Sequence, residues 1–190
     1  MYKIVTYYQE DPTAIVSYRM NSRYYWAEHI NYTRNAIISI VAGLADLDAI
    51  TARLMKNQED IGDLLRPYYS TEAVDRLVVL LKDHITGALD IVKAAKAGED
   101  LVLLQTAWQQ NANLIAEFLN SVNSVNWPKM LVAPMWAEHM DLTIQEAQAR
   151  LAGRWDEDIA AYDANHKCII DFAEVFSVGV VSQNLESFCK

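Results

Sequence analysis

The segments YWAEHINYT (residues 25–33) and MWAEHMDLT (residues 135–143) are nearly the same, although they lie far apart in the chain. Each places Trp, His and Thr at positions i−3, i and i+4, which share one face of an α-helix. Midway between them, Asp83-His84-Ile85 repeats the acidic–His–apolar centre of the segment. The histidines His29, His84 and His139 are therefore evenly spaced, since 84 − 29 and 139 − 84 are both 55.

The stretches between these histidines also resemble each other. KNQEDIGDLL (residues 56–65) aligns with QNANLIAEFL (residues 110–119), which places Asn57 over Asn111 and Ile61 over Ile115. A fixed period of this length is typical of a repeated supersecondary unit. The pattern predicts a helical hairpin of about 55 residues that recurs along the chain.

The fold class follows from the few helix-breaking residues and from the apolar spacing between them. The chain has six glycines and four prolines, and apolar residues recur between them with helical periodicity. The loops between the expected helices are only a few residues long, and short loops favour antiparallel neighbouring helices. We therefore expect an all-α, up-and-down bundle over residues 23–178, with a C-terminal tail at 179–190. The expected helices are 23–43, 46–66, 70–98, 99–122, a fifth that starts near Pro128 or Pro134 and ends by Gly153, and 154–176.

The first 22 residues have a different composition. IVTYY and AIVSY are rich in β-branched and aromatic residues and are separated by the turn-like sequence QEDP (residues 9–12). Seven of the ten tyrosines precede residue 33. We therefore expect residues 1–22 to form a short hairpin or an extended arm that packs on the bundle. Exchange of this arm with a second subunit would produce a homodimer.

Composition narrows the classes of partner and compartment. The formal net charge is −9, and no basic run or basic amphipathic face is present, so neither a nucleic acid nor an anionic membrane surface is expected as a partner. The N-terminus does not resemble a signal peptide, and no apolar run is long enough to span a bilayer. The two cysteines have no metal-type spacing. A cytoplasmic protein is the expectation.

The three histidines share helix faces with apolar residues, so we expect them to point inward. Buried imidazoles need partners, because an unpaired buried polar group costs about 1–3 kcal/mol. Three histidines with an open position suit Zn²⁺, and an added carboxylate suits Fe²⁺, Mn²⁺ or Ni²⁺ equally well. The sequence offers Asp60 or Asp158 as a fourth ligand or general base. Side-chain amides that would orient the imidazoles are Asn57, Gln58, Asn111 and Asn113.

Three interpretations of this set remain open at the level of sequence. The first is a metal-binding protein with His29, His84 and His139 as ligands, which would act as a metal-dependent hydrolase or transferase on a small-molecule substrate. The second is a non-enzymatic binding or interaction module in which the His, Asn and Asp side chains form a structural polar core. The third is a polar pocket for a small organic ligand.

Two resemblances accompany these residues. Trp26-x-x-His29 with Thr33-Arg34, Asn57-Gln58-x-Asp60-Ile61-Gly62, and the later Trp108, Glu138-His139 and Trp155 motifs resemble a group of small all-helical bacterial proteins. That resemblance covers residues 26 to about 176 and implies a discrete helical module without an assigned activity. The chain is more loosely similar to DinB-type bundles, and this similarity implies one divalent metal held by three histidines from different helices.

Overall fold

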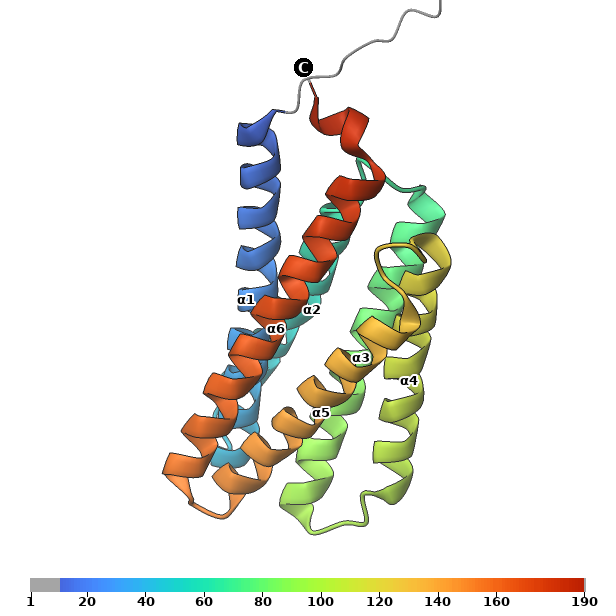
Figure 1. Ribbon diagram of the computed structural model, residues 1–190. Coiled ribbons are helices and arrows are strands. Elements are labelled where there is room, and N and C mark those ends of the chain that lie inside the picture. The colour runs from blue at the N-terminus through green and yellow to red at the C-terminus, as the bar shows by residue number, and fades with distance from the viewer. Residues whose placement is uncertain (1–10, 190) are drawn as a thin grey trace, which may run out of the picture.

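The computed structural model describes residues 11–189, which form six long α-helices and one short 3₁₀-helix (Figure 1). The all-α bundle expected from the sequence is confirmed. The elements in chain order are α1 (Pro12–Ala42), α2 (Leu47–Asp63), α3 (Thr71–Ala97), α4 (Val102–Val122), α5 (Lys129–Leu151), α6 (Trp155–Gln183) and η1 (Leu185–Phe188).

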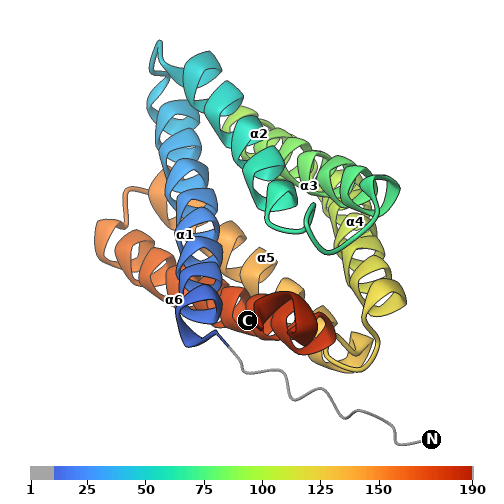
Figure 2. The same cartoon turned by 90° about the horizontal axis from the view of Figure 1, so that it is seen from above.

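The helices form a closed arrangement with three of them at its centre. Each helix packs against the next one in the chain, and α6 packs back against α1 (Figures 1 and 2). In addition, α1, α3 and α5 contact one another. Side chains that point inward from these three helices can therefore meet at one point, although they come from distant parts of the chain.

Helix boundaries follow the capping residues that the sequence supplies. Asp11 caps α1 by accepting hydrogen bonds from the backbone N–H groups of Thr13 and Ala14, and Ser70 caps α3 in the same way. α1 and α3 end at Gly43 and Gly98, whose φ angles of 67° and 73° are left-handed. These residues set the lengths of two of the three central helices.

Two boundary predictions were wrong. Residues 12–22 are not an extended arm, because α1 begins at Pro12, and Asp11-Pro12 is a helix start rather than a turn. At the other end, α6 continues to Gln183, and Phe188 of η1 is buried against the rings of Tyr18 and Tyr68. The tail from residue 179 is therefore largely part of the bundle. The segment IVTYY lies outside the described residues.

α5 contains Pro134 in its second turn, so the helix begins after Pro128, which is its N-cap residue. Pro134 is the sixth residue of α5, so its missing N–H removes one hydrogen bond within the helix, to the carbonyl oxygen of Met130, and the helix nevertheless continues to Leu151. Within residues 11–189, no helix is both long and apolar enough to cross a membrane.

Close packing around His84 depends on a glycine. Gly87 lies one turn after His84 on α3, and a Cβ built there would be 2.8 Å from Cδ1 of Trp108. The Trp108 indole stacks on the His84 ring with centroids 5.0 Å apart, and its Nε1 donates a hydrogen bond to the His84 carbonyl oxygen at 2.9 Å. Gly87 thus leaves the space in which Trp108 covers His84.

We expect Gly87→Ala to destabilise the fold. In an open helix interior, Gly→Ala would stabilise by about 1 kcal/mol, but overpacking against a buried indole costs about 1–3 kcal/mol. Urea denaturation followed by circular dichroism should show a lower free energy of unfolding for this variant. Thr86→Ala, at an exposed neighbouring position, is the matched control. A gain in stability for Gly87→Ala would contradict this account of the packing.

Candidate functional site

The structure brings His29, His84 and His139 together in the centre of the bundle. The ring centroids of His29 and His139 are 5.6 Å apart, those of His84 and His139 are 5.6 Å apart, and those of His29 and His84 are 6.5 Å apart. The side chains come from α1, α3 and α5, the three helices that contact one another. All three residues are at most 1% exposed. We call these three side chains the histidine cluster.

The histidine cluster is uncharged at neutral pH. Burial, with a smaller contribution from the neighbouring His139, lowers the pKa of His29 to about 3. Burial also lowers the pKa of His139 to about 4. The pKa of His84 lies well below its usual value because of burial and the two other imidazoles. Each ring is therefore a neutral imidazole, with one N–H donor and one nitrogen that carries a lone pair.

A closed set of hydrogen bonds holds the ring of His139. Nδ1 of His139 lies 2.7 Å from Oδ1 of Asn165, whose Nδ2 donates to the Thr143 hydroxyl at 2.9 Å. That hydroxyl in turn donates to the carbonyl oxygen of His139 at 2.8 Å. Because the amide oxygen can only accept, the ring proton is on Nδ1, and the lone pair is on Nε2.

The two other imidazoles also have a side-chain amide beside them. Gln58 on α2 interacts with His29 and Asn111 on α4 interacts with His84, and each interaction opposes the fall in the histidine's pKa. The amide nitrogens of Gln58 and Asn111 donate to backbone carbonyl oxygens, so their oxygens remain as acceptors. These oxygens and both ring nitrogens of His29 and His84 have no hydrogen-bond partner. The amides therefore face the imidazoles without a formed hydrogen bond.

The remaining residues predicted for the site lie elsewhere. Asn57 is buried, donates to the Tyr25 carbonyl oxygen and accepts from Gln58, so it supports that amide rather than a histidine. Asn113 is on the exposed side of α4.

The two predicted carboxylates are occupied by cations. Asp60 binds Arg53 and Lys56, and the buried Asp158 binds Arg34 and Arg150. These ion pairs place both aspartates outside the histidine cluster. In the described part of the chain, no group of three or more His, Cys, Asp or Glu side chains, the histidine cluster included, has a metal-binding arrangement as it stands. The histidines and their amides are therefore a separate site from both aspartates.

Tryptophan rings form one wall of the histidine cluster. The Trp26 ring centroid is 5.7 Å from that of His29, and the Trp136 centroid is 5.0 Å from that of His84 and 5.8 Å from that of His139. Both indole Nε1 atoms are buried and have no hydrogen-bond partner. The site thus combines unpaired imidazole nitrogens with unpaired indole N–H donors.

A second buried polar group lies further along α5. Arg34 donates to Glu146 at 2.8 Å and to Asp158 at 3.0 Å, and Arg150 donates to Asp158 at 2.7 Å. The Arg34 guanidinium also lies over the Tyr162 ring, 4.5 Å from its centroid. Burial raises the pKa of Glu146 to about 7, while the charge of Arg34 opposes this shift and that of Asp158 adds to it.

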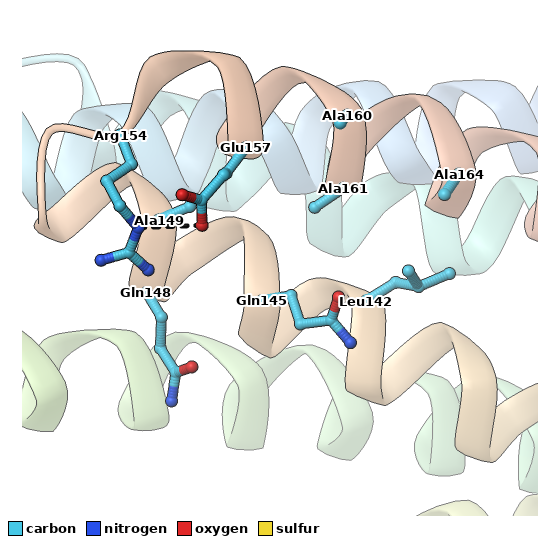
Figure 3. Close-up of a pocket in the computed structure, with 9 residues that line it drawn as sticks. All are labelled: Leu142, Gln145, Gln148, Ala149, Arg154, Glu157, Ala160, Ala161 and Ala164. Carbon is cyan, nitrogen blue, oxygen red and sulfur yellow. Dashed lines mark hydrogen bonds and ion pairs between the residues drawn. The ribbon is translucent and has the colours of Figure 1, made fainter.

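Two hollows lie near these groups. The larger is an open groove of about 350 Å³ between α5 and α6, and its lining includes Gln145 and Gln148 of α5 and three alanines of α6 (Figure 3). It is a surface feature, and none of its lining residues belongs to the histidine cluster. The smaller is an apolar cavity of about 20 Å³ between α3, α4 and α5, and Trp108 and Thr143 are among its lining residues. These two residues contact His84 and His139.

Three residues of the site were not identified from the sequence. Asn165 supplies an amide on α6 that no prediction included, and it lies seven residues, or two helical turns, after Asp158 on the same face, where Asp158 was predicted as a fourth ligand or general base. The three amides follow their histidines by similar intervals, 29 to 58, 84 to 111 and 139 to 165, and a search for amides at that interval would have found it. Glu146 and Arg34 had no such signal, because their pairing depends on the packing of α1 against α5.

Glu146 makes the stability of the fold depend on pH. Its pKa is higher in the folded protein, about 7, than in an unfolded chain, so the folded state binds the extra proton between these values. Stability from this group is therefore lost as the pH rises from about 4.5 to about 7. Relative to Glu146→Gln, the wild type should lose about 2.5 kcal/mol between pH 5 and pH 8.

Urea unfolding of both proteins at pH 5, 6, 7 and 8 measures this difference. Glu157→Gln, which removes an exposed carboxylate, is the control. Parallel pH profiles for the wild type and Glu146→Gln would contradict a buried carboxyl group that titrates near neutrality.

Comparisons with known proteins give no family for this chain. No protein-family model matches it, and no curated protein or solved structure matches it significantly. The chemistry of the histidine cluster has to be inferred from its own residues.

Proposed function

We propose that the protein binds one divalent transition-metal ion through His29, His84 and His139. One observation carries this proposal: three neutral imidazoles from three different helices meet in the core, and four of their ring nitrogens have no partner. Each buried unpaired polar atom costs about 1–3 kcal/mol. A cation shared by the three lone pairs would remove that cost and would provide a reason for the cluster.

The separation of the rings is close to what such an ion requires. A Zn–N distance of 2.0–2.1 Å places the centroids of three coordinating imidazoles about 5–5.5 Å apart. The distances in the cluster are 5.6–6.5 Å, so the rings would have to approach by up to about 1.5 Å and turn their lone pairs inward. Movements of this size need rotation of side chains but no rearrangement of helices.

The amides support metal binding because they would select the correct form of each ring. Ligating histidines usually donate their second N–H to an acceptor, which fixes the tautomer. Asn165 already accepts from His139, and the free oxygens of Gln58 and Asn111 are beside His29 and His84. One histidine on an odd-numbered helix and one amide on the next helix recur three times. This recurrence supports the internal repeat of helical hairpins, which we include in the proposal.

The donor set favours Zn²⁺ over the other ions considered. Fe²⁺ and Mn²⁺ prefer sites with a carboxylate, and the two candidates, Asp60 and Asp158, bind arginine and lysine side chains. A bound Zn²⁺ would supply Lewis acidity. Because the three histidines are at most 1% exposed, a substrate larger than a few atoms cannot reach them in this conformation. The site therefore fits a structural or small-ligand role better than a hydrolase or transferase acting on a large substrate.

The closed hydrogen-bond set around His139 favours a second candidate, in which the cluster is a structural polar core without metal. In that case the protein would be a non-enzymatic interaction module. His29 and His84 argue against it, since neither ring has a hydrogen bond at either nitrogen.

Metal analysis of protein prepared without an affinity tag or chelator separates the two candidates. After exposure to Zn²⁺ and gel filtration, we expect one equivalent of zinc in the wild type and a large loss in His84→Ala. His166→Ala is the matched control, because His166 is the fourth histidine of the chain and lies outside the cluster. At a free Zn²⁺ concentration 100 times its Kd, the wild type should gain about 2.7 kcal/mol of stability.

His84→Gln keeps a polar side chain of similar size, so it distinguishes loss of the metal ligand from loss of the fold in His84→Ala. We expect it to fold and to lose the zinc-dependent increase in Tm. If the wild type contains no bound metal after separate exposure to Zn²⁺, Fe²⁺, Mn²⁺ and Ni²⁺, the proposal is rejected in favour of the structural polar core.

A further inference from the structure

We propose that the indole N–H groups of Trp26 and Trp136 form a binding site for a small anion beside the histidine cluster. This inference rests on the proposed function, because the anion would bind together with the metal ion. It assigns a role to two side chains that the metal proposal leaves unexplained. The ligand class is a monovalent anion of the size of azide or formate.

The first argument is the state of the two indoles. Trp26 is 1% exposed and Trp136 is 2% exposed, and neither Nε1 has a hydrogen-bond partner. An indole N–H can only donate, and a buried tryptophan usually has an acceptor for it. Trp108 and Trp127 follow this rule, since each donates to a backbone carbonyl oxygen. Both unpaired donors belong to indoles that pack against the histidine rings, as does Trp108, whose N–H is paired.

The second argument is the position of these rings relative to each other. The centroids of Trp26 and Trp136 are 6.2 Å apart, and both indoles contact Phe172. Trp26 adjoins His29, while Trp136 adjoins His84 and His139. Each indole occupies the position three residues before its histidine on the same helix, so the two rings have equivalent places on α1 and α5 beside the cluster.

The third argument is the charge of the occupied site. Three neutral imidazoles leave a bound divalent ion with a charge of +2 in the core. In the described part of the chain, no carboxylate contributes to the pKa shift of any of the three histidines. A buried charge without a counter-charge is strongly unfavourable. An anion that accepts hydrogen bonds from the indoles would reduce the net charge and pair both donors.

The size of the ligand follows from access. The cluster is closed to solvent, and the nearby cavity that Trp108 and Thr143 help to line is apolar and has a volume of about 20 Å³. That volume is about enough for one water molecule. Passage of an anion as large as benzoate would require separation of α3, α4 and α5, whereas azide or formate would need smaller displacements of side chains.

The experiment uses the Co²⁺-loaded protein, because the visible spectrum of Co²⁺ reports changes in its surroundings. Cobalt content is measured first, and azide is then titrated into the wild type, Trp26→Phe, Trp136→Phe and Trp127→Phe. Loss of one hydrogen bond to a charged group should weaken azide binding roughly tenfold to a hundredfold in the first two variants. Trp127→Phe removes a buried indole whose N–H is already paired, so it should bind azide as the wild type does.

A second measurement needs no variants. Azide and formate should raise the Tm of the Co²⁺-loaded wild type but not that of the metal-free protein, and benzoate should have no effect on either. If all proteins take up cobalt and the phenylalanine variants bind azide with unchanged affinity, the indole site is wrong while metal binding stands. If the wild type takes up no cobalt, both the metal proposal and the indole site are rejected.

Discussion

Burial of three imidazoles at the meeting of α1, α3 and α5 is the constraint on which the rest of this structure depends. The rings are closed to bulk solvent, and in the described fold only one ring nitrogen, Nδ1 of His139, is seen bonded to a side chain. A domain of this size is stable by only about 5–15 kcal/mol, so several unpaired polar atoms at one point are a large fraction of its stability. Their retention in the core is easiest to understand if something binds to them.

The surroundings of the histidine cluster are built to keep the rings neutral and in place. Side-chain amides come from the outer helices α2, α4 and α6, and aromatic rings fill the space between the inner ones. Trp108 covers His84 because Gly87 leaves room for it. Further along α5, the ion pairs of Arg34 and Arg150 hold α1, α5 and α6 together and confine charge to a separate buried group. The bundle thus contains an uncharged polar group, the histidine cluster, and a separate group of buried ion pairs further along α5.

Much of the fold could be predicted from the sequence, because its signals are local. Periodic apolar residues, Ser70 as a helix cap, and Gly43 and Gly98 as helix ends each act within one or two turns. Convergence of His29, His84 and His139 could also be expected, since the even spacing of one motif implies equivalent positions in equivalent helices. Local signals misled at Asp11-Pro12, where a turn-like pair is the cap and first residue of α1.

The partners of the site could not be predicted in the same way, because they depend on which helix faces meet. Asp158 carries a carboxylate that could bind a metal ion, but the packing of α1 and α5 against α6 places the guanidinium groups of Arg34 and Arg150 next to its oxygens. Asn165, two turns further along α6, faces His139 instead. Because both residues lie on the same face of α6, choosing between them requires the position of α6 along its axis relative to α5, which the pattern of apolar residues does not define.

The order of the chain has a consequence for how the protein is made. His29 leaves the ribosome early, but its neighbours His84 and His139 follow much later, and Asn165 later still. An N-terminal fragment therefore contains at most an incomplete set of donors, and the long-range packing of α6 on α1 has to close before the centre is sealed. During synthesis, the unfinished chain would expose the aromatic rings that later enclose the core, so the interval before the last hairpin docks is when chaperones are most needed.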